Sequence, residues 1–542
     1  MRLLGGLRMP TPTPETDGSA KPPSPLASPV FRALWIATIV SNVGTWMHDI
    51  GAGWLMTSLS PDPLMVALVQ SATTLPMFLL ALPAGALADI VDRRKLLIGA
   101  QILGLVAAAL LAAATLGGLT TAPVLLAFTL AIATSAALSA PAFQAMVSEL
   151  VPSAALPQAV ALNSLGVNIA RAIGPALGGV IIAVSGPPAV FALNAVSVLG
   201  VLAVLIGWRR EPIASTLPPE HFFGAVRAGA RYAAQSSALQ VVLVRSLGFF
   251  LFSSALWALL PIVGRRDLGL SAGAYGGLLT CMGIGAVVGA MLLPRLRERL
   301  SVNAVTVAAS LTFALSMGGL ALAPHFTAAA AAMGVAGLAW IAMLSSLNGA
   351  AQQSAPAWVK ARALAISLVV FQGAMTAGAS AWGALAAAAG TQVALLAAAG
   401  ALVLALPLLA LRFPMPAGKL DLAPSSHWPA PLVEGEIAAD RGPVLITVEY
   451  QVAPGRSAAF ARAMQPMRRI RRRDGAMSWG LYEDAARPGV MLETFVVESW
   501  LEHLRQHERV TQADREFQDA AQAFHIGEDP PLVRHMIRPA AS

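Results

Sequence analysis

Two ionisable side chains lie deep inside long apolar stretches of this sequence. Asp49 falls within the apolar segment 31–57, and Arg171 falls within the segment 158–184. A charged group inside such a segment is costly, so residues of this kind typically serve protons, ions or substrates. Asp49 is therefore the predicted proton-coupling or cation-sensing carboxylate, unless it is simply hydrated near an outer mouth. Arg171 would either hold an anionic substrate or pair with an acid such as Glu149.

Six amide side chains occur in segments of the same kind and suit the wall of a polar cavity. Amides both donate and accept hydrogen bonds, so they suit contacts between neighbouring helices equally well. The sequence leaves these two roles open. The cavity candidates are Asn42, Gln70, Asn163, Asn168, Asn348 and Gln372.

A glycine- and proline-rich run occupies the middle of the segment 158–184. Pro175 within a helix removes a backbone hydrogen bond and favours a kink. Gly174, Gly178 and Gly179 carry no side chain, so a neighbouring helix can approach them closely. This run is the predicted helix-packing motif, with ordinary packing of small residues as the alternative interpretation.

The composition indicates what kind of protein carries these residues. Of the 542 residues, 56% are hydrophobic and 12% are charged, whereas a soluble domain has about 25% charged residues. The chain is therefore predicted to be a polytopic membrane protein. Its net charge of +8 fits basic loops at a membrane, and no nucleic-acid partner is expected. With one cysteine, Cys281, and no phosphate-binding loop, no metal or cofactor is expected, and transport would use an ion gradient.

Twelve segments are long and apolar enough to cross a membrane, which takes about 20 residues. Basic residues gather in alternate connections between these segments, so the positive-inside rule places both termini in the cytoplasm. The exception is the pair Arg265-Arg266, which falls in an outer connection. The segments are 31–57, 64–87, 96–117, 122–146, 158–184, 188–208, 239–262, 271–293, 302–322, 326–348, 362–388 and 391–411.

The twelve segments divide into two equal groups. A disordered cytoplasmic tail (1–28) precedes the amino-terminal half (29–208), and a linker with an interfacial helix (209–238) leads to the carboxy-terminal half (239–412). A shift of about 204 residues places Arg93 on Arg297. Transporters built from repeats bind substrate between their halves. A second linker (413–443) then joins a soluble cytoplasmic domain (444–542).

The soluble domain alternates strands with helices. Strands are predicted near 445–452, 478–482, 490–497 and 533–537, and the order βαββαβ predicts a small α+β, ferredoxin-like fold. The fold class is thus an all-α membrane protein of twelve helices in two halves plus this domain. A basic run within 468–473 suits lipid head groups or a solvated helix end. His503 and His507 lie one helical turn apart and are predicted to be a surface pair without a metal.

A charged hairpin between the second and third segments resembles the signature of the major facilitator superfamily, Gly-x-x-x-Asp-basic-x-Gly-basic-basic. Ile90 and Asp92 depart from this signature. The resemblance implies a gating loop, in which the aspartate pairs with the neighbouring half in one conformation; a plain turn that anchors the topology is the alternative. The matching residues are Gly85, Asp89, Arg93 and Arg94.

Further resemblances narrow the expectation. The glycine-proline run resembles a fifth-segment motif of exporters in this superfamily, and residues 41–49 with 84–92 resemble its secretion or siderophore-exporter-like subgroup. The carboxy-terminal domain is similar in pattern to dimeric α/β-barrel domains related to antibiotic-biosynthesis monooxygenases. That resemblance implies dimerisation through this domain, and no catalysis is expected of it.

Together these features predict an exporter of a small organic molecule, such as a drug, siderophore or metabolite, in a bacterial inner membrane. Alternating access would be ion-coupled, most simply by proton antiport. Protons, the substrate and membrane lipids are the expected partners. An importer is the alternative in the same class. A membrane-anchored sensor or enzyme acting through the carboxy-terminal domain, or a scaffold assembled through it, is the alternative from another class.

Overall fold

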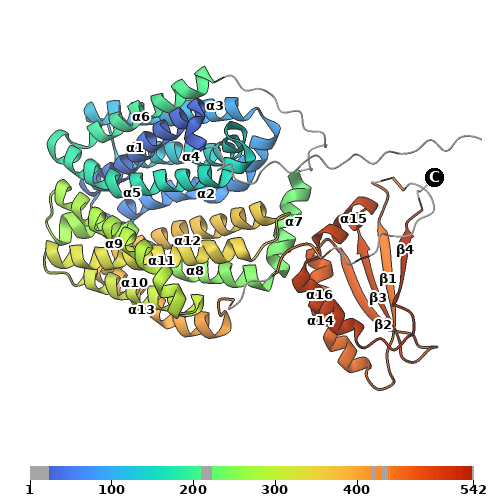
Figure 1. Ribbon diagram of the computed structural model, residues 1–542. Coiled ribbons are helices and arrows are strands. Elements are labelled where there is room, and N and C mark those ends of the chain that lie inside the picture. Colours follow the sequence, from blue (N-terminus) through green and yellow to red (C-terminus); the bar gives the residue numbers. More distant parts are fainter. Residues whose placement is uncertain are drawn as a thin grey trace, which may run out of the picture.

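The computed structural model describes residues 24–208, 222–416, 421–425, 428, 437–438 and 440–539 of the chain. Most of the predicted tail 1–28, part of the linker 209–238 and about half of the linker 413–443 lie outside these described residues. The rest forms a long helical bundle with a small domain of strands and helices beside one end of it (Figure 1).

Six long helices form the first half of the bundle, and short polar residues mark where several of them begin. Ser28, Asp62 and Asp92 each accept a backbone N–H from the first turn of the following helix. These bonds satisfy donors that a helix end otherwise leaves unpaired. The elements are η1 (Pro25–Ala27), α1 (Pro29–Leu59), α2 (Pro63–Ile90), α3 (Arg93–Leu116), α4 (Ala122–Leu150), η2 (Ser153–Ala155), α5 (Leu156–Ser185) and α6 (Pro187–Gly207).

Six more long helices form the second half, after a short amphipathic helix, α7 (Phe222–Gln235). This helix occupies the linker in which the sequence predicts an interfacial helix. A short π-helical turn, η3, follows the first long helix of this half. The elements are α8 (Ser237–Ile262), η3 (Val263–Asp267), α9 (Ala272–Arg299), α10 (Val302–Ala321), α11 (Phe326–Gln353), α12 (Lys360–Ala389) and α13 (Thr391–Arg412).

Within the described residues, eleven helices are long and apolar enough to cross a membrane. The predicted first segment, α1, is not among these eleven, so eleven of the twelve predicted segments meet this measure. The reason is that the middle of α1 carries polar side chains, including Asn42, His48 and Asp49, which lower its hydropathy. Its 31 residues nevertheless form one continuous helix in the first half.

Each half packs as a unit, and the two halves meet mainly along two pairs of helices, with smaller contacts of α1 and α2 with α8. Within the first half, α1 contacts α5 and α6, and α2 and α3 contact α4. Between the halves, α2 contacts α12, and α5 contacts α9. The hydroxyls of Ser71 and Thr74 on α2 hydrogen-bond those of Ser380 and Thr376 on α12, at oxygen–oxygen distances of 3.0 and 2.7 Å. Polar bonds of this kind hold helices together in an apolar setting.

The two arginines of η3 close one end of the bundle, the end predicted to face outward. Arg265 donates to the Trp54 carbonyl at 3.2 Å, and its guanidinium stacks on the Trp54 ring, 5.1 Å from the centroid. Arg266 donates to the carbonyls of Ser60 and Pro61 at 2.6 and 2.5 Å. Carbonyls at a helix carboxyl end lack internal partners and carry partial negative charge. The second half therefore caps the end of α1 in the first half.

The carboxy-terminal domain has a four-stranded antiparallel sheet in the order β2-β3-β1-β4. Four strands are present as predicted, but the predicted second helix is divided into two. Thr511 separates these two helices by capping the second of them in a capping box with Asp514. The elements are β1 (Val444–Gln451), α14 (Ser457–Arg473), β2 (Ser478–Glu483), β3 (Val490–Val497), α15 (Trp500–Arg509), α16 (Gln512–Gln522) and β4 (Leu532–Ile537).

The basic run at the end of α14 is partly internal, which corrects the prediction of a solvated or lipid-binding helix end. Arg471 is 5% exposed and makes two hydrogen bonds to the buried Glu493. Arg473 pairs with Asp474 at 2.8 Å and with Asp514 at 2.7 Å. A buried charge is tolerated only with such partners. Two of the arginines thus hold the helix to the rest of the domain.

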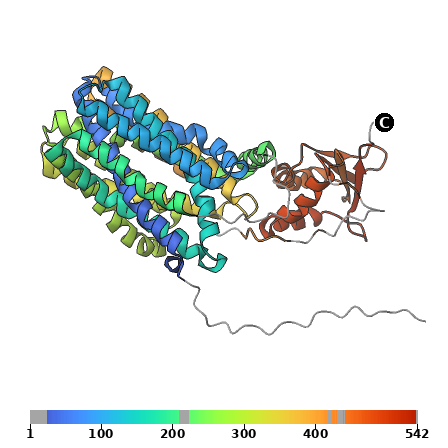
Figure 2. The same cartoon turned by 90° about the horizontal axis from the view of Figure 1, so that it is seen from above.

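The domain docks onto the bundle through its helices, next to α7 (Figures 1 and 2). Arg231 of α7 pairs with Glu502 of α15 at 3.1 Å, and the Arg473 guanidinium lies over the Tyr232 ring, 5.8 Å from its centroid. Arg509 lies 4.6 Å from the ring centroid of Trp358, in the connection between α11 and α12. The same domain therefore contacts the linker between the halves and a connection within the second half.

His503 is buried, which corrects the prediction of a surface histidine pair. It is 2% exposed, and its ring lies 4.9 Å from that of His507 and 4.7 Å from that of His535, between centroids. Burial lowers the pKa of His503 to about 3 and also lowers the pKa of His535. The domain is therefore built around neutral histidines.

Acid is expected to destabilise this domain from about pH 6.5 downward. An unfolded histidine binds a proton near pH 6.5, whereas folded His503 does not, so the unfolded state gains protons first. Each such histidine removes about 1.4 kcal/mol of unfolding free energy per pH unit. Protease cleavage of the domain within the full chain, compared at pH 7.5 and 5.5, measures this loss. His503→Phe should make the loss shallower, whereas the exposed His325→Gln should not; equal pH dependence in all three proteins would contradict the prediction.

Replacing both η3 arginines with alanine is expected to open the end that they close. A hydrogen bond to a charged group contributes about 1.5–3 kcal/mol, so losing several should shift the population between closed and open states by more than about tenfold. Spin labels on Leu119→Cys and Leu322→Cys, in a Cys281→Ser background, report the distance between the halves at that end. Arg412→Ala, which removes an arginine at the other end of the bundle, is the control. An unchanged distance distribution in the double variant would refute the proposed closure.

Candidate functional site

A cavity of about 320 Å³ lies between the two halves. The first half contributes residues from α1, α2 and α5, and the second half contributes residues from α8, α9, α11 and α12. Four residues that the sequence singles out line it: Asp49, Gln70, Arg171 and Gln372. The structure thus brings together the two charged candidates with one amide from each half.

The two charged side chains reach the cavity from different helices of the first half. Asp49 lies on α1 and is half-buried. Arg171 lies on α5, and its guanidinium lies 5.8 Å from the ring centroid of Trp46, a cation–π distance. The ion pair that the structure gives Glu149 is with Arg93, at 2.7 Å, so the predicted pairing of Arg171 with Glu149 is not observed. Arg171 therefore presents its charge to the cavity.

Aromatic side chains form much of the cavity wall, and sequence reasoning missed them. Their rings come from both halves, and Trp257 has an indole N–H that finds no acceptor among the described residues. Lipid-facing and cavity-facing aromatics look alike in an apolar sequence, so no local signal distinguishes them. An aromatic wall suits flat, apolar groups of a ligand, while an unpaired N–H suits an acceptor. The aromatic residues are Trp46, Trp257, Tyr275, Trp340 and Phe371.

A second cavity, of about 730 Å³, lies inside the first half. Asn42 and Asn163 line this cavity, and Asp49 lines both cavities. Asn168 and Asn348 are exposed and lie outside the residues that line either cavity, and the Asn168 amide donates to the Ser164 carbonyl at 2.9 Å. Of the six amides, four therefore face a cavity.

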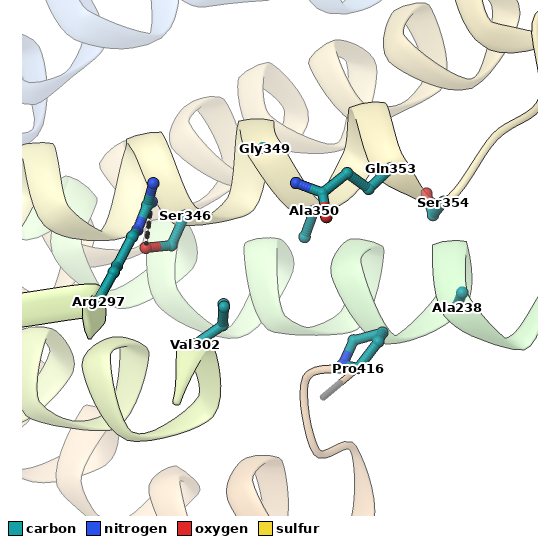
Figure 3. A pocket seen from close by; sticks show the side chains of 9 residues that line it. All are labelled: Ala238, Arg297, Val302, Ser346, Gly349, Ala350, Gln353, Ser354 and Pro416. Carbon is teal, nitrogen blue, oxygen red and sulfur yellow. Dashed lines mark hydrogen bonds between the residues drawn. The ribbon is translucent and has the colours of Figure 1, made fainter. Parts of the chain in front are cut away.

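A third, smaller cavity of about 150 Å³ lies in the second half, near the ends of α9 and α11. Figure 3 shows Arg297 reaching from α9 toward Ser346 of α11, to which it donates at 3.1 Å. In the first half, Arg93 at the start of α3 reaches Glu149 near the end of α4 in a similar way. Arg93 and Arg297, which the shift of about 204 residues aligns in sequence, thus each bind the fourth long helix of their own half.

The gating loop makes its described contacts within the first half. Arg94 donates to the carbonyls of Leu205 and Ile206 at 2.7 and 2.8 Å, and so caps the end of α6. A Cβ placed on Gly85 would meet no atom within 4 Å. The side chain of Asp89, the predicted latch, lies outside the described residues.

The glycines of α5 stand at close helix contacts. A Cβ on Gly174 would lie 2.5 Å from the Trp46 Cβ, and one on Gly178 would lie 3.1 Å from the Met47 Cα. A Cβ on Gly179 would lie 2.8 Å from the Cα of Gly276 on α9, in the other half. Pro175 is accommodated within a continuous α5. These glycines let α5 approach α1 on one side and the second half on the other.

No group of three or more histidine, cysteine, aspartate or glutamate side chains suits a metal ion in the part of the chain that the structure describes. The site therefore offers the Asp49 carboxyl group, the Arg171 guanidinium, two amides and aromatic rings. Such a set suits reversible binding of a small molecule and of a proton.

Solved structures with the same fold include transporters. A bacterial homologue of the human lysosomal transporter Spinster, in an inward-facing form, is 14% identical with a TM-score of 0.57, over 72% of this chain and 98% of that chain. The nucleoside transporter NupG is 13 to 14% identical in two structures, with TM-scores of 0.56 and 0.57, over 71% of this chain and 98% of that chain. At this identity the likeness concerns the fold alone.

Relatives by sequence include two transporters. The staphyloferrin A transporter of Staphylococcus aureus is 24% identical over 280 residues, which are 51% of this chain and 70% of that protein. The enterobactin exporter EntS of Salmonella choleraesuis is 25% identical over 319 residues, 59% of this chain and 76% of that protein.

The family described as transmembrane secretion effector matches residues 20–542. The match covers both halves of the bundle and extends through the carboxy-terminal domain. The predicted superfamily is thereby confirmed, and the alternative of an enzyme is excluded. The chain belongs to the transmembrane secretion effector family of the major facilitator superfamily, whose members are secondary transporters.

Proposed function

We propose that this transporter exports a small organic molecule across the inner membrane of a bacterium by proton-coupled alternating access. The observation that carries the proposal is the cavity between the halves, which brings Asp49 and Arg171 beside an aromatic wall. Ligand pockets typically measure about 300–1,000 Å³, and this cavity has about 320 Å³. Similarity to siderophore exporters supports export over import.

The cavity residues have complementary tasks in this proposal. The aromatic rings hold the apolar part of the substrate, and Arg171 attracts an anionic or acceptor group. Asp49 binds a proton in exchange for the substrate. Proton binding thus favours release of the substrate, and substrate binding favours release of the proton. Such coupling needs only that the two ligands differ in affinity for the two states of the carrier.

Alternating access would follow from the way in which the halves meet. The arginines of η3 close the outer end, so the cavity would load from the inner side in this state. Breaking their bonds while α5 and α9 rock past each other would then open the outer end. The close glycine contact between these helices provides a compact pivot.

The proposed topology has twelve spans with both termini in the cytoplasm, and α1 is the additional span. A helix of 31 residues reaches about 45 Å, at 1.5 Å per residue, which suffices to cross a bilayer. Its polar face lines cavities, so lipid does not have to contact it. The outer Arg265 and Arg266, which depart from the positive-inside pattern, have a structural task in closing the bundle.

The carboxy-terminal domain is proposed to be a ferredoxin-like domain that lies in the cytoplasm. Its sheet order and element order support that fold. Its helices face the bundle, and side chains on the other face of the sheet, such as Leu532 and Met536, are about half exposed. That face would accept a second copy, as the resemblance to dimeric barrels implies.

Transport in inside-out membrane vesicles tests the proposal, with enterobactin and staphyloferrin A as the first probes. Vesicles acidified inside should accumulate an exported probe, and a protonophore should abolish the accumulation. Asp49→Asn should lower proton-driven uptake by at least about tenfold, as a loss of about 1.4 kcal/mol would do. Arg171→Gln should weaken binding of an anionic probe.

Glu298→Gln, an exposed acid at the end of α9, is the matched control and should transport like the wild type. Accumulation in right-side-out vesicles instead would support the importer. Unchanged accumulation across a broad substrate panel in all of these variants would overturn the proposed function.

A further inference from the structure

We infer that the cavity inside the first half is a hydrated path along which protons reach Asp49 without passing through the substrate cavity. The inference deepens the proposed function and rests on it for the direction of coupling. It concerns the 730 Å³ cavity, whose lining comes from the first six long helices alone.

A polar stripe on α1 leads through this cavity to the carboxylate. Thr38, Asn42, Thr45 and Asp49 follow one another at spacings of four, three and four residues and all line the cavity. This spacing keeps them on one face of a helix with 3.6 residues per turn, over about 16 Å of its length. Such a stripe in a membrane helix needs a polar surrounding.

Buried polar atoms in the cavity lack partners within the described part of the protein. Both ring nitrogens of His48 are in this position, and that side chain is 1% exposed. The Thr129 hydroxyl and the side-chain carbonyl oxygen of Asn194 also lack a hydrogen-bond partner, and both side chains are 2% exposed. All three residues line the cavity. The lining of the cavity is therefore polar on helices other than α1 as well.

The size and chemistry of the cavity favour water over a second substrate. A volume of 730 Å³ holds on the order of twenty waters at about 30 Å³ each. Polar cavities fill with water, whereas apolar ones stay dry. Among the described residues that line it, Asp49 is the one charged group, and no lysine or arginine there would attract an anion. Hydrogen-bonded water beside hydroxyls and amides can pass protons along.

Asp49 stands where this cavity meets the substrate cavity. Asp49 and Thr73 line both of them. The ionisable groups that face Asp49 are His48 on its own helix, Arg171 from α5 and Tyr275 from α9. The lining residues from α2, α8, α11 and α12 include no ionisable group. Asp49 can therefore take a proton from one cavity and respond to substrate in the other.

Thiol chemistry tests whether the path holds water. Only a thiolate reacts fast with a methanethiosulfonate, and a thiol ionises in water but not in lipid. In a Cys281→Ser background, Asn42→Cys and Thr45→Cys should react with 2-aminoethyl methanethiosulfonate at least about tenfold faster than Val106→Cys. Val106 lies on α3 with an exposed apolar side chain and is the matched control.

Proton exchange tests whether the path serves Asp49. The infrared band of the protonated carboxyl, identified by its absence in Asp49→Asn, should exchange with deuterium oxide rapidly in the wild type. Asn42→Leu/Thr45→Val should slow this exchange at least about tenfold, because it interrupts the polar stripe. Thr45→Val alone, which is nearly isosteric, separates this effect from misfolding.

Either of two results would overturn the path: thiols at 42 and 45 no more reactive than at 106, or equal exchange rates in wild type and double variant. Neither measurement needs a transported substrate. If the cavity is hydrated but the protein fails the vesicle assay, the proton path stands and the proposed export is rejected. If the protein exports its probe with protons but the cavity is dry, the proposed export stands and the proton path is rejected.

Discussion

Charged and polar groups inside an apolar bundle must find partners within the protein, and the arrangement of this transporter depends on that constraint. Asp49 is placed where two cavities meet, and Arg171 lies against an aromatic ring. The polar face of α1 lowers the hydropathy of this helix below that of its neighbours, which is why it escapes a simple count of apolar spans. The helix least suited to lipid is the one on which the proposed coupling site is built.

The same constraint shapes the contacts between the halves. Hydroxyl pairs join α2 to α12, glycines bring α5 against α9, and two arginines donate to carbonyls near the end of α1. The arginine contacts are side chain to backbone and can break together, whereas the glycine contact is a backbone approach that tolerates rocking. The closed end thus depends on hydrogen bonds from arginine side chains, whereas the proposed pivot depends on close contact between helix backbones.

The carboxy-terminal domain adds a further constraint on this mechanism. It contacts α7, which links the halves, and Trp358 in a connection of the second half. Those segments would move relative to one another as the halves rock. An ion pair between Arg231 and Glu502 and the stacking of Arg473 on Tyr232 and of Arg509 on Trp358 hold the domain in this position. The domain would therefore have to follow such a movement or break these contacts.

Much of the fold and part of the candidate site could be predicted from the sequence, because hydropathy, loop charge and glycine spacing are local properties set by the membrane and by helix geometry. They predicted the helices, the division into halves and the strands of the small domain, with Asp49 and Arg171 as coupling candidates and Gln70 and Gln372 as cavity candidates. The tertiary structure alone decided that Asn168 and Asn348 face away from these cavities, that Trp257 and Trp340 line the site, and that His503 and Arg471 are buried. It also decided that Arg265 and Arg266, which depart from the predicted charge pattern, contact the end of α1. Each of these depends on which distant helix lies opposite a side chain, and an apolar sequence carries no signal for that, because lipid and protein neighbours are equally apolar.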